Sequence, residues 1–183
     1  YSDTVITANS YNDSVSFFYG ENLIEDKVIS VGPKPNDLLM HDYKVYVICG
    51  ESNSMVIYDL KEDKSIGEVA TESWPHSIDM DFNNKLLFVS NLESDSITVI
   101  SMDNYDTVEN IQVPEYPTKI RVSNDKKRIY ICCSYLGKDK RGYIDVINIG
   151  NFQKIARVMV GYSPIDMIED DDNIYVSNFT DGT

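Results

Sequence analysis

Val45-Tyr46-Val47 is the first of four segments in which an aromatic residue stands between two aliphatic residues. The others are Leu87-Phe88-Val89, Ile129-Tyr130-Ile131 and Ile174-Tyr175-Val176. The aromatic residues follow one another at intervals of 42, 42 and 45 residues, and Val5-Ile6-Thr7 lies 40 residues upstream as a fifth copy. A period in this range indicates a repeat protein, in which each copy is one supersecondary unit.

Each repeat contains four strand-like segments in the same order. A proline opens the first segment, a polar turn follows, and the aromatic segment is the second. Two further segments with alternating side chains complete the repeat. β-branched and aromatic residues with a period of two predict strands, and no window has the pattern of an amphipathic helix. The opening prolines are Pro35, Pro75, Pro117 and Pro164.

Four strands in ~40–45 residues are typical of one blade of a β-propeller. A single blade cannot bury both of its faces, so blades pack side by side and their inner strands become apolar on both sides. We therefore predict an all-β fold, a β-propeller of four-stranded antiparallel blades. Residues 1–183 form one domain of about four and a half blades: a partial blade at 1–32, blades at 33–69, 70–113 and 114–160, and a partial blade at 161–183.

The repeats also resemble a known family. Ile174-Tyr175-Val176-Ser177-Asn178 is similar to the Tyr-Val-Thr-Asn signature of the YVTN β-propeller repeat family. Val31-Gly32-x-x-Pro35 and Val160-Gly161-x-x-Pro164 resemble its Val-Gly-x-x-Pro linker. The resemblance covers essentially the whole chain and implies the propeller fold. It implies no single activity, because the family includes surface-layer proteins, lactonase-like enzymes and binding modules.

Two repeats depart from this signature, since Cys49 and Cys133 stand where it has Asn. An Asn amide can bond to turn backbone and a thiol does so poorly, so we expect these two turns to be held differently. With Cys132 the chain has three cysteines, which include a vicinal pair and no C-x-x-C spacing. The pattern predicts free, buried thiols and favours a reducing or anaerobic setting.

The strand count is seventeen, and the last aromatic strand has no third or fourth strand after it. A propeller closes because an open sheet edge invites aggregation. We therefore expect a fragment of a larger propeller, for example a seven-bladed one of roughly 300 residues. A closed four-bladed ring, and a half-propeller that self-associates through unpaired blade edges, are the alternatives.

Composition and motifs exclude several classes of function. The net charge is -14, with 30 acidic and 16 basic residues, and such a surface repels phosphate backbones, so we expect no nucleic-acid partner. No stretch approaches ~18 consecutive apolar residues, so we expect no membrane span. The sequence contains no G-x-S-x-G, H-E-x-x-H, P-loop or dinucleotide motif, so we expect no catalytic residue, no cofactor and no metal site.

The first candidate site residues lie in the loops that lead into the first strands. Lys34, Trp74, Tyr116 and Ser163 directly precede the four prolines, and the repeat should place them around the central channel on one face. Trp74 is the only tryptophan, and exposed aromatic residues mark recognition surfaces. The alternative is that Trp74 and Tyr116 cover the gaps between blades.

Five further candidates lie in the strands and in one long loop. His76 either contacts a ligand or is a hydrogen-bonded loop residue. Asp79 and Arg121 occupy equivalent first-strand positions, and they either pair with each other or present charge to a small ligand. Residues 134–142 form a basic insertion in an acidic chain, which makes Lys138 and Arg141 candidates for partner binding; the alternative is a solvated hairpin tip.

The sequence therefore predicts a non-enzymatic propeller scaffold, a binding module that presents a loop face to a protein or small-molecule partner. One alternative, implied by the resemblance, is a lactonase-like hydrolase that uses His, Arg and Glu groups at the channel mouth. A further alternative is a structural protein of the cell or spore surface. The compartment stays open between the cytoplasm and the cell or spore surface.

Overall fold

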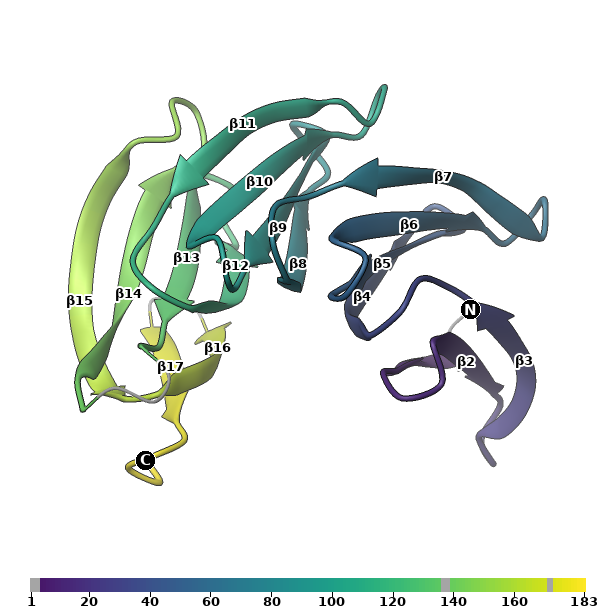
Figure 1. Cartoon of the computed structure of the whole chain (residues 1–183), viewed down its shortest axis with the longest axis horizontal. Helices are drawn as coiled ribbons and strands as arrows, with labels where there is room; N and C mark the ends of the chain where they lie inside the picture. The colour runs from purple at the N-terminus through teal and green to yellow at the C-terminus, as the bar shows by residue number, and fades with distance from the viewer. Residues whose placement is uncertain (1–3, 136–138, 171–172) are drawn as a thin grey trace. The chain divides into compact units, whose positions relative to one another are not determined.

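The computed structural model describes residues 4–135, 139–170 and 173–183, and every regular element within these ranges is a β-strand (Figure 1). In the same ranges no helix is long and apolar enough to cross a membrane. The chain divides into two compact units, Tyr1–Pro75 and His76–Thr183, and each unit is described by itself.

Unit 1 contains two antiparallel sheets whose strands pair in chain order. The first sheet has three strands: β1 (Thr4–Asn9), β2 (Ser14–Tyr19) and β3 (Ile24–Ser30). The second has four: β4 (Pro35–His41), β5 (Lys44–Cys49), β6 (Ser54–Asp59) and β7 (Lys64–Ala70). A four-stranded meander of this kind is a propeller blade.

Unit 2 contains two four-stranded sheets and one two-stranded sheet (Figure 1). The first consists of β8 (Pro75–Asp81), β9 (Leu86–Asn91), β10 (Ser96–Ser101) and β11 (Thr107–Gln112). The second consists of β12 (Pro117–Val122), β13 (Arg128–Cys133), β14 (Arg141–Asn148) and β15 (Lys154–Tyr162). The last pairs β16 (Pro164–Asp170) with β17 (Asn173–Asn178). The predicted all-β fold of four-stranded antiparallel blades is confirmed.

The repeated aromatic residue is the second-strand core residue of each full sheet. Tyr46, Phe88 and Tyr130 are 2%, 0% and 5% exposed, and their cross-strand partners on the third strand are all aliphatic. Tyr175, the copy in β17, is 56% exposed, because among the described residues β17 pairs with β16 alone. Burial of this residue therefore depends on the neighbouring strands and sheets.

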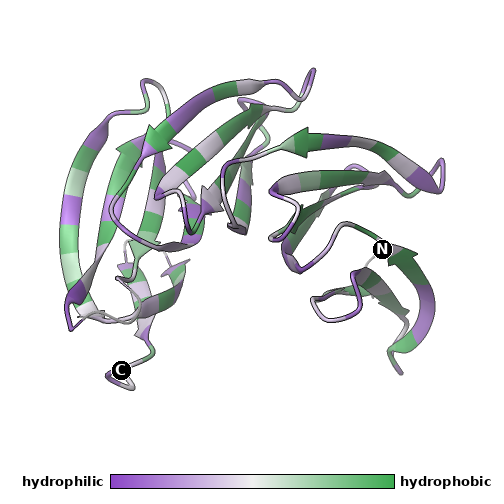
Figure 2. Cartoon of the chain, in the orientation of Figure 1, coloured by the Kyte–Doolittle hydropathy of each residue, from purple (hydrophilic) through white to green (hydrophobic). Residues whose placement is uncertain are grey.

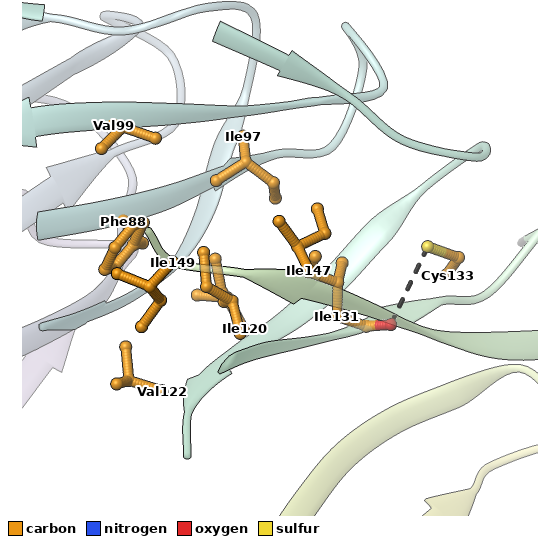
Figure 3. Packing of buried hydrophobic residues seen from close by; sticks show 10 residues of the cluster. Phe88, Ile97, Val99, Ile120, Val122, Ile131, Cys133, Ile147 and Ile149 are labelled. Atoms are coloured by element: carbon orange, nitrogen blue, oxygen red, sulfur yellow. Dashed lines mark hydrogen bonds between the residues drawn. The ribbon is translucent and has the colours of Figure 1, made fainter. Parts of the chain in front are cut away.

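The largest described core lies between the sheets β8–β11 and β12–β15 in unit 2 (Figure 3). Phe88, Ile97 and Val99 come from one sheet, and Ile120 and Ile131 come from the other. The inner strands are buried on both faces, while the fourth strands of the sheets are mostly exposed. This burial pattern is the one that side-by-side packing of blades requires.

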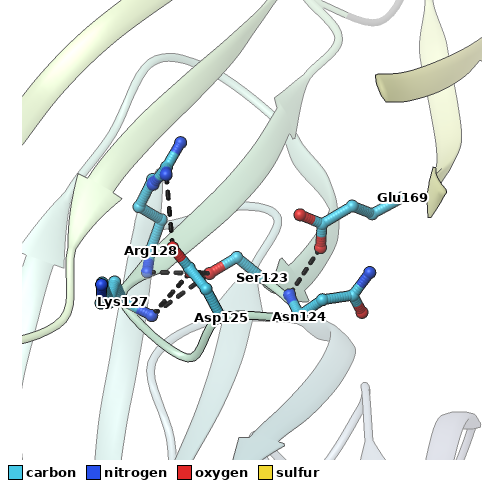
Figure 4. Close-up of polar contacts among 6 residues, drawn as sticks. All are labelled: Ser123, Asn124, Asp125, Lys127, Arg128 and Glu169. Carbon is cyan, nitrogen blue, oxygen red and sulfur yellow. Dashed lines mark hydrogen bonds and ion pairs between the residues drawn. The ribbon is translucent and has the colours of Figure 1, made fainter. Parts of the chain in front are cut away.

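Polar contacts hold the turns between the first and second strands, as the β12–β13 turn illustrates (Figure 4). The Ser123 hydroxyl donates to Asp125 Oδ1 over 2.6 Å and lowers the pKa of that carboxyl, together with the backbone N–H of Lys127. Glu169 of β16 accepts the N–H of Asn124 over 2.6 Å. The turn of one sheet is thereby tied to the next sheet.

Candidate binding site

The loops that enter the first strands share one backbone conformation. Lys34, Trp74, Tyr116 and Ser163 have φ angles of 56°, 57°, 56° and 52°. Left-handed backbone costs a non-glycine residue about 1–2 kcal/mol, so surrounding contacts must hold it. We call residues 31–34, 71–74, 113–116 and 161–163 the loop face.

Side chains 21 residues earlier hold three of these loops. Asp13 Oδ1 accepts the N–H of Lys34 over 3.0 Å, Asn53 Oδ1 accepts that of Trp74 over 2.8 Å, and Asp95 Oδ1 accepts that of Tyr116 over 2.9 Å. These acceptors lie in the turns between the second and third strands, so antiparallel pairing places turn and loop at the same end of the sheet. The result is a loop with a fixed backbone.

The side chains on this fixed backbone differ from loop to loop. Lys34 Nζ lies 4.5 Å from the ring centroid of Tyr11. The Trp74 ring lies over Gly50, where an added Cβ would sit 3.5 Å from Cε2. This contact favours the interpretation that Trp74 covers part of the sheet before it.

Tyr116 lines a groove of about 510 Å³ in unit 2. The other lining residues are Leu92, Glu93, Asp95 and Glu115. All three candidates Lys34, Trp74 and Tyr116 are half-buried, so each exposes part of its side chain. Their placement around one channel stays a prediction.

The residues after three of the four opening prolines form a hydrogen bond to the carbonyl of a residue 39–46 positions further along the chain. In unit 1, Asn36 Nδ2 donates to the Pro75 carbonyl over 2.7 Å. In unit 2, His76 Nδ1 lies 2.8 Å from the Thr118 carbonyl, and Thr118 Oγ1 donates to the Pro164 carbonyl over 2.8 Å. A carbonyl only accepts, so His76 carries its proton on Nδ1. His76 is thus a hydrogen-bonded residue at the start of β8.

Asp79 and Arg121 also link neighbouring sheets of unit 2. Asp79 Oδ1 accepts the N–H of Met80 and Oδ2 accepts that of Val122, both over 2.8 Å. Arg121 Nη2 donates to the Met167 carbonyl over 3.4 Å. Both side chains thus have backbone partners, and the interpretation that they also pair with each other stays a prediction. Arg121 also lines an open hollow of about 480 Å³ beside β16 and β17.

The basic insertion is described in part. Lys138 lies outside the described residues. Arg141 is exposed, and its Nε donates to the Val160 carbonyl over 2.9 Å. Tyr135, within the insertion, and Tyr143, directly after it, have ring centroids 6.0 Å apart in an edge-to-face arrangement.

Sequence reasoning missed an ion pair beside this insertion. Asp145 is 1% exposed, and its two oxygens accept hydrogen bonds from Arg157 over 2.6 and 2.9 Å. These bonds raise the pKa of the Arg157 guanidinium above its ordinary value. The signal was present, since Asp145 interrupts an apolar third strand and Arg157 is a basic residue in the following strand.

The three thiols are buried and free, as predicted. Burial raises the pKa of Cys49 to about 11 and that of Cys132 to about 12. In the described part of the chain, no group of three or more His, Cys, Asp or Glu side chains is arranged to hold a metal ion.

Sheet order, burial and the loop geometry define a β-propeller protein. No protein-family model matches the sequence, and no curated protein matches it. The YVTN family therefore stays a resemblance. Solved structures, in contrast, do match.

Hydrazine synthase of Kuenenia stuttgartiensis aligns with a TM-score of 0.85 at 19% identity, over 91% of this chain and 49% of that one. A provisionally assigned 6-phosphogluconolactonase of Bacteroides uniformis ATCC 8492 aligns with a TM-score of 0.78 at 15% identity, over 96% and 60%. A protein of unknown function from Desulfotomaculum acetoxidans DSM 771 aligns with a TM-score of 0.79 at 15% identity, over 96% of this chain and 58% of that one. The chain thus spans 49–60% of the length of these structures, and at such identities the likeness shows the fold alone.

Proposed function

We propose that this chain is part of a non-enzymatic β-propeller binding module, whose loop face contacts a protein or a small-molecule partner. The proposal concerns the loops 31–34, 71–74, 113–116 and 161–163, each within its own unit. It rests on how the polar groups of the first strands are used.

The observation that carries the proposal is the commitment of His76, Asp79 and Arg121 to hydrogen bonds between sheets. Nδ1 of His76, both oxygens of Asp79 and Nη2 of Arg121 have backbone partners in the structure. A general acid or base needs a proton-transferring atom that can reach the substrate, and a convergent set of such groups defines a catalytic site. The contacts of Asp79 and Arg121 favour a structural role for these two side chains, and the Nδ1 contact of His76 orients its ring, with Nε2 as the atom through which an acid or base would act.

On the loop face, in contrast, the backbone is held in place and the side chains are partly exposed. Its backbone is fixed by Asp13, Asn53 and Asp95, while the residues that it presents are a lysine, a tryptophan and a tyrosine. Rigid loops with varied aromatic and cationic side chains are typical of recognition surfaces, because aromatic residues supply contact area at low entropic cost. This combination supports binding.

Amide NMR of the labelled protein during a fragment screen tests the proposal. We expect chemical-shift changes to cluster on the loop face. Clustering at the opposite turns, residues 42–43, 82–85 and 123–127, would contradict it. Trp74→Ala should remove the changes at residues 71–74, whereas Phe82→Ala, which removes an aromatic residue that is 51% exposed in an opposite turn, should leave them.

The lactonase-like alternative has one observation in its favour, the fold likeness to the provisionally assigned 6-phosphogluconolactonase. That likeness, at 15% identity, carries no active-site residue to this chain. His76 is the side chain on which the alternative depends, because His41 is the only other histidine. Turnover of lactones by the parent protein and by a His76 variant separates the two functions.

A further inference from the structure

The outer hairpin formed by β14 and β15 differs in charge from the other three outer hairpins. Residues 141–162 hold three basic side chains and one acidic side chain. The corresponding hairpins, residues 14–30, 54–70 and 96–112, have net charges of -2, -2 and -3. A net charge of +2 at one place on a chain of net charge -14 marks a surface suited to an acidic partner.

The edge of this hairpin is the longest outer strand. β15 has nine residues, whereas β3, β7 and β11 have seven, seven and six. It lies at the end of the strand order in its sheet, and Ile155, Val158 and Met159 are 55%, 54% and 56% exposed. Figure 2 shows apolar and polar bands along this strand.

Outer strands usually carry charges of a kind that discourages pairing with another chain. β3, β7 and β11 each include at least one acidic residue, whereas the charged residues of β15 are Lys154 and Arg157. On an acidic molecule, acidic edges repel acidic segments, and a basic edge attracts them. β15 therefore lacks the acidic charge that its counterparts carry, and its own charges would attract an acidic segment.

The cations at this edge are held in place by buried and aromatic neighbours. Arg157 is fixed by both oxygens of Asp145, and its guanidinium lies 5.3 Å from the ring centroid of Tyr143. Lys154, with half of its side chain exposed, stands 3.9 Å from Asp145. Fixed cations lose less conformational entropy when a partner binds.

We propose that the edge of β15 binds an extended, acidic segment of a partner protein by strand addition. Main-chain hydrogen bonds to the outer edge of β15, which among the described strands pairs with β14 alone, would supply affinity, and the side chains would supply selectivity. Arg157 and Met159 share one face of β15, because they are two residues apart. An added strand thus places an acidic residue beside Arg157 and an apolar residue, two positions away, beside Met159.

The surface proposed here, residues 154–160 of β15, includes no residue of the loop face, which on this strand begins at residue 161. The inference therefore does not depend on the proposed loop-face function. A negative result for peptide binding at β15 would therefore not contradict binding at the loop face, and the reverse also holds.

Fluorescence anisotropy with a labelled peptide of Glu-Thr-Val-Thr repeats, which places Glu and Val in turn along one face of a strand, tests the inference. The peptide of Lys-Thr-Val-Thr repeats is the matched probe. We expect saturable binding of the Glu peptide that weakens at high salt, and hydrogen exchange that slows along residues 154–160. Lys154→Glu should weaken binding by about tenfold or more, because the reversed charge repels the peptide. Met159→Ser, an exposed change at the same edge, should also weaken it.

Lys64→Glu is the control, because Lys64 is the first residue of β7 as Lys154 is of β15. Its hairpin is already acidic, so we expect unchanged binding. Equal affinities of the Lys154→Glu and Lys64→Glu variants would overturn the inference. So would equal binding of the Lys peptide, displacement of the Glu peptide by a uridine oligonucleotide, or protection of residues 154–160 by self-association without peptide.

Discussion

At the scale of single residues, the fifth residue of each aromatic signature is either an asparagine or a cysteine. Asn9 Nδ2 donates to Ser16 Oγ over 2.8 Å, and Asn91 Nδ2 donates to Thr98 Oγ1 over 2.9 Å. Where Cys49 and Cys133 replace Asn, the third strand has Val56 and Asp145 in place of that hydroxyl. The amide and the hydroxyl are therefore lost together.

The hydrogen-bond partners of the Asn amide differ from the expected ones. The amide of Asn was expected to hold turn backbone. Its main partners are third-strand hydroxyls, although Asn91 Nδ2 also reaches the Ser96 carbonyl over 3.4 Å. The thiols of Cys49 and Cys133 instead face the carbonyls of Val47 and Ile131 over 3.8 and 3.9 Å. The expected difference between the two kinds of repeat is present.

The first prediction concerns the amide oxygen of Asn91, which is buried and has no partner among the described residues. In the first sheet the equivalent oxygen of Asn9 accepts a hydrogen bond from Thr7 over 3.2 Å. Val89 stands at the place of Thr7, so Val89→Thr should supply the missing donor and stabilise the protein by up to about 1 kcal/mol. Urea denaturation measures the change.

Val47→Thr is the matched control, because Val47 is as buried as Val89 but precedes Cys49. Without an amide to receive the hydroxyl, this variant should lose about 1–3 kcal/mol. Equal shifts in the two variants would rule out the hydrogen-bond explanation.

The second prediction concerns the thiols. Burial raises the pKa of Cys49 to about 11 and that of Cys132 to about 12, and it also raises the pKa of Cys133, so all three are protonated at pH 8. Because the thiolate is the reactive form, an aromatic disulfide reagent should label none of them in the native protein and all three in denaturant. Rapid stoichiometric labelling of the native protein would contradict this burial.

At the scale of elements, the loop face depends on single side chains in the turns. The third prediction is that Asp95→Ala lowers the free energy of unfolding by about 2 kcal/mol, because Tyr116 loses its hydrogen bond and Ala replaces an Asp with φ of 52°. Asp95→Asn keeps both features, as Asn53 does in unit 1, and should be close to neutral. Thermal denaturation of both variants measures the change in the free energy of unfolding. Similar losses of stability in the two variants would show that neither the hydrogen bond to Tyr116 nor the backbone conformation is the cause.

The fourth prediction concerns a link between β3 and the β6–β7 turn in unit 1. Asp63 accepts hydrogen bonds from the Lys27 ammonium and, over 2.7 Å, from the Tyr58 hydroxyl; the first of these mainly lowers the pKa of Asp63. A lowered carboxyl pKa contributes stability that is complete above the unfolded value of about 4 and is lost as pH falls through the folded value. Asp63→Asn should therefore destabilise the protein at pH 6 and lose its effect in acid.

Unfolding midpoints of Asp63→Asn and the parent protein over this pH range check the link. Lys27→Met removes the ammonium and should reproduce the result. A difference between parent and Asp63→Asn that stays constant down to the acid limit would show that the carboxylate charge is not involved.

At the scale of the whole molecule, the period of the aromatic residues predicted the strands, their order and the all-β class. It did so because Tyr46, Phe88 and Tyr130 are buried at the same position of the second strand in each sheet. The partners of the polar residues were not predictable in this way. The His76 and Thr118 contacts join residues 42 and 46 positions apart, and their geometry depends on how neighbouring sheets of unit 2 pack against each other.

The left-handed residues before the prolines show the same limit. Their equivalence was visible in the sequence, but Lys, Trp, Tyr and Ser give no sign of positive φ. At Lys34, Trp74 and Tyr116 this conformation is held by Asp13, Asn53 and Asp95, which lie 21 residues earlier. The pairing of Asp145 with Arg157 was within reach, because cross-strand register follows from a short hairpin. Long-range polar contacts were not.

The central claim is that His76 holds two sheets together and performs no chemistry. Steady-state hydrolysis of 6-phosphogluconolactone and simple lactones, by the parent protein and by His76→Ala, tests it most directly. We expect no saturable hydrolysis by either protein, and a free energy of unfolding that is lower by about 1 kcal/mol in the variant. Saturable hydrolysis that His76→Ala abolishes, at unchanged stability, would contradict it.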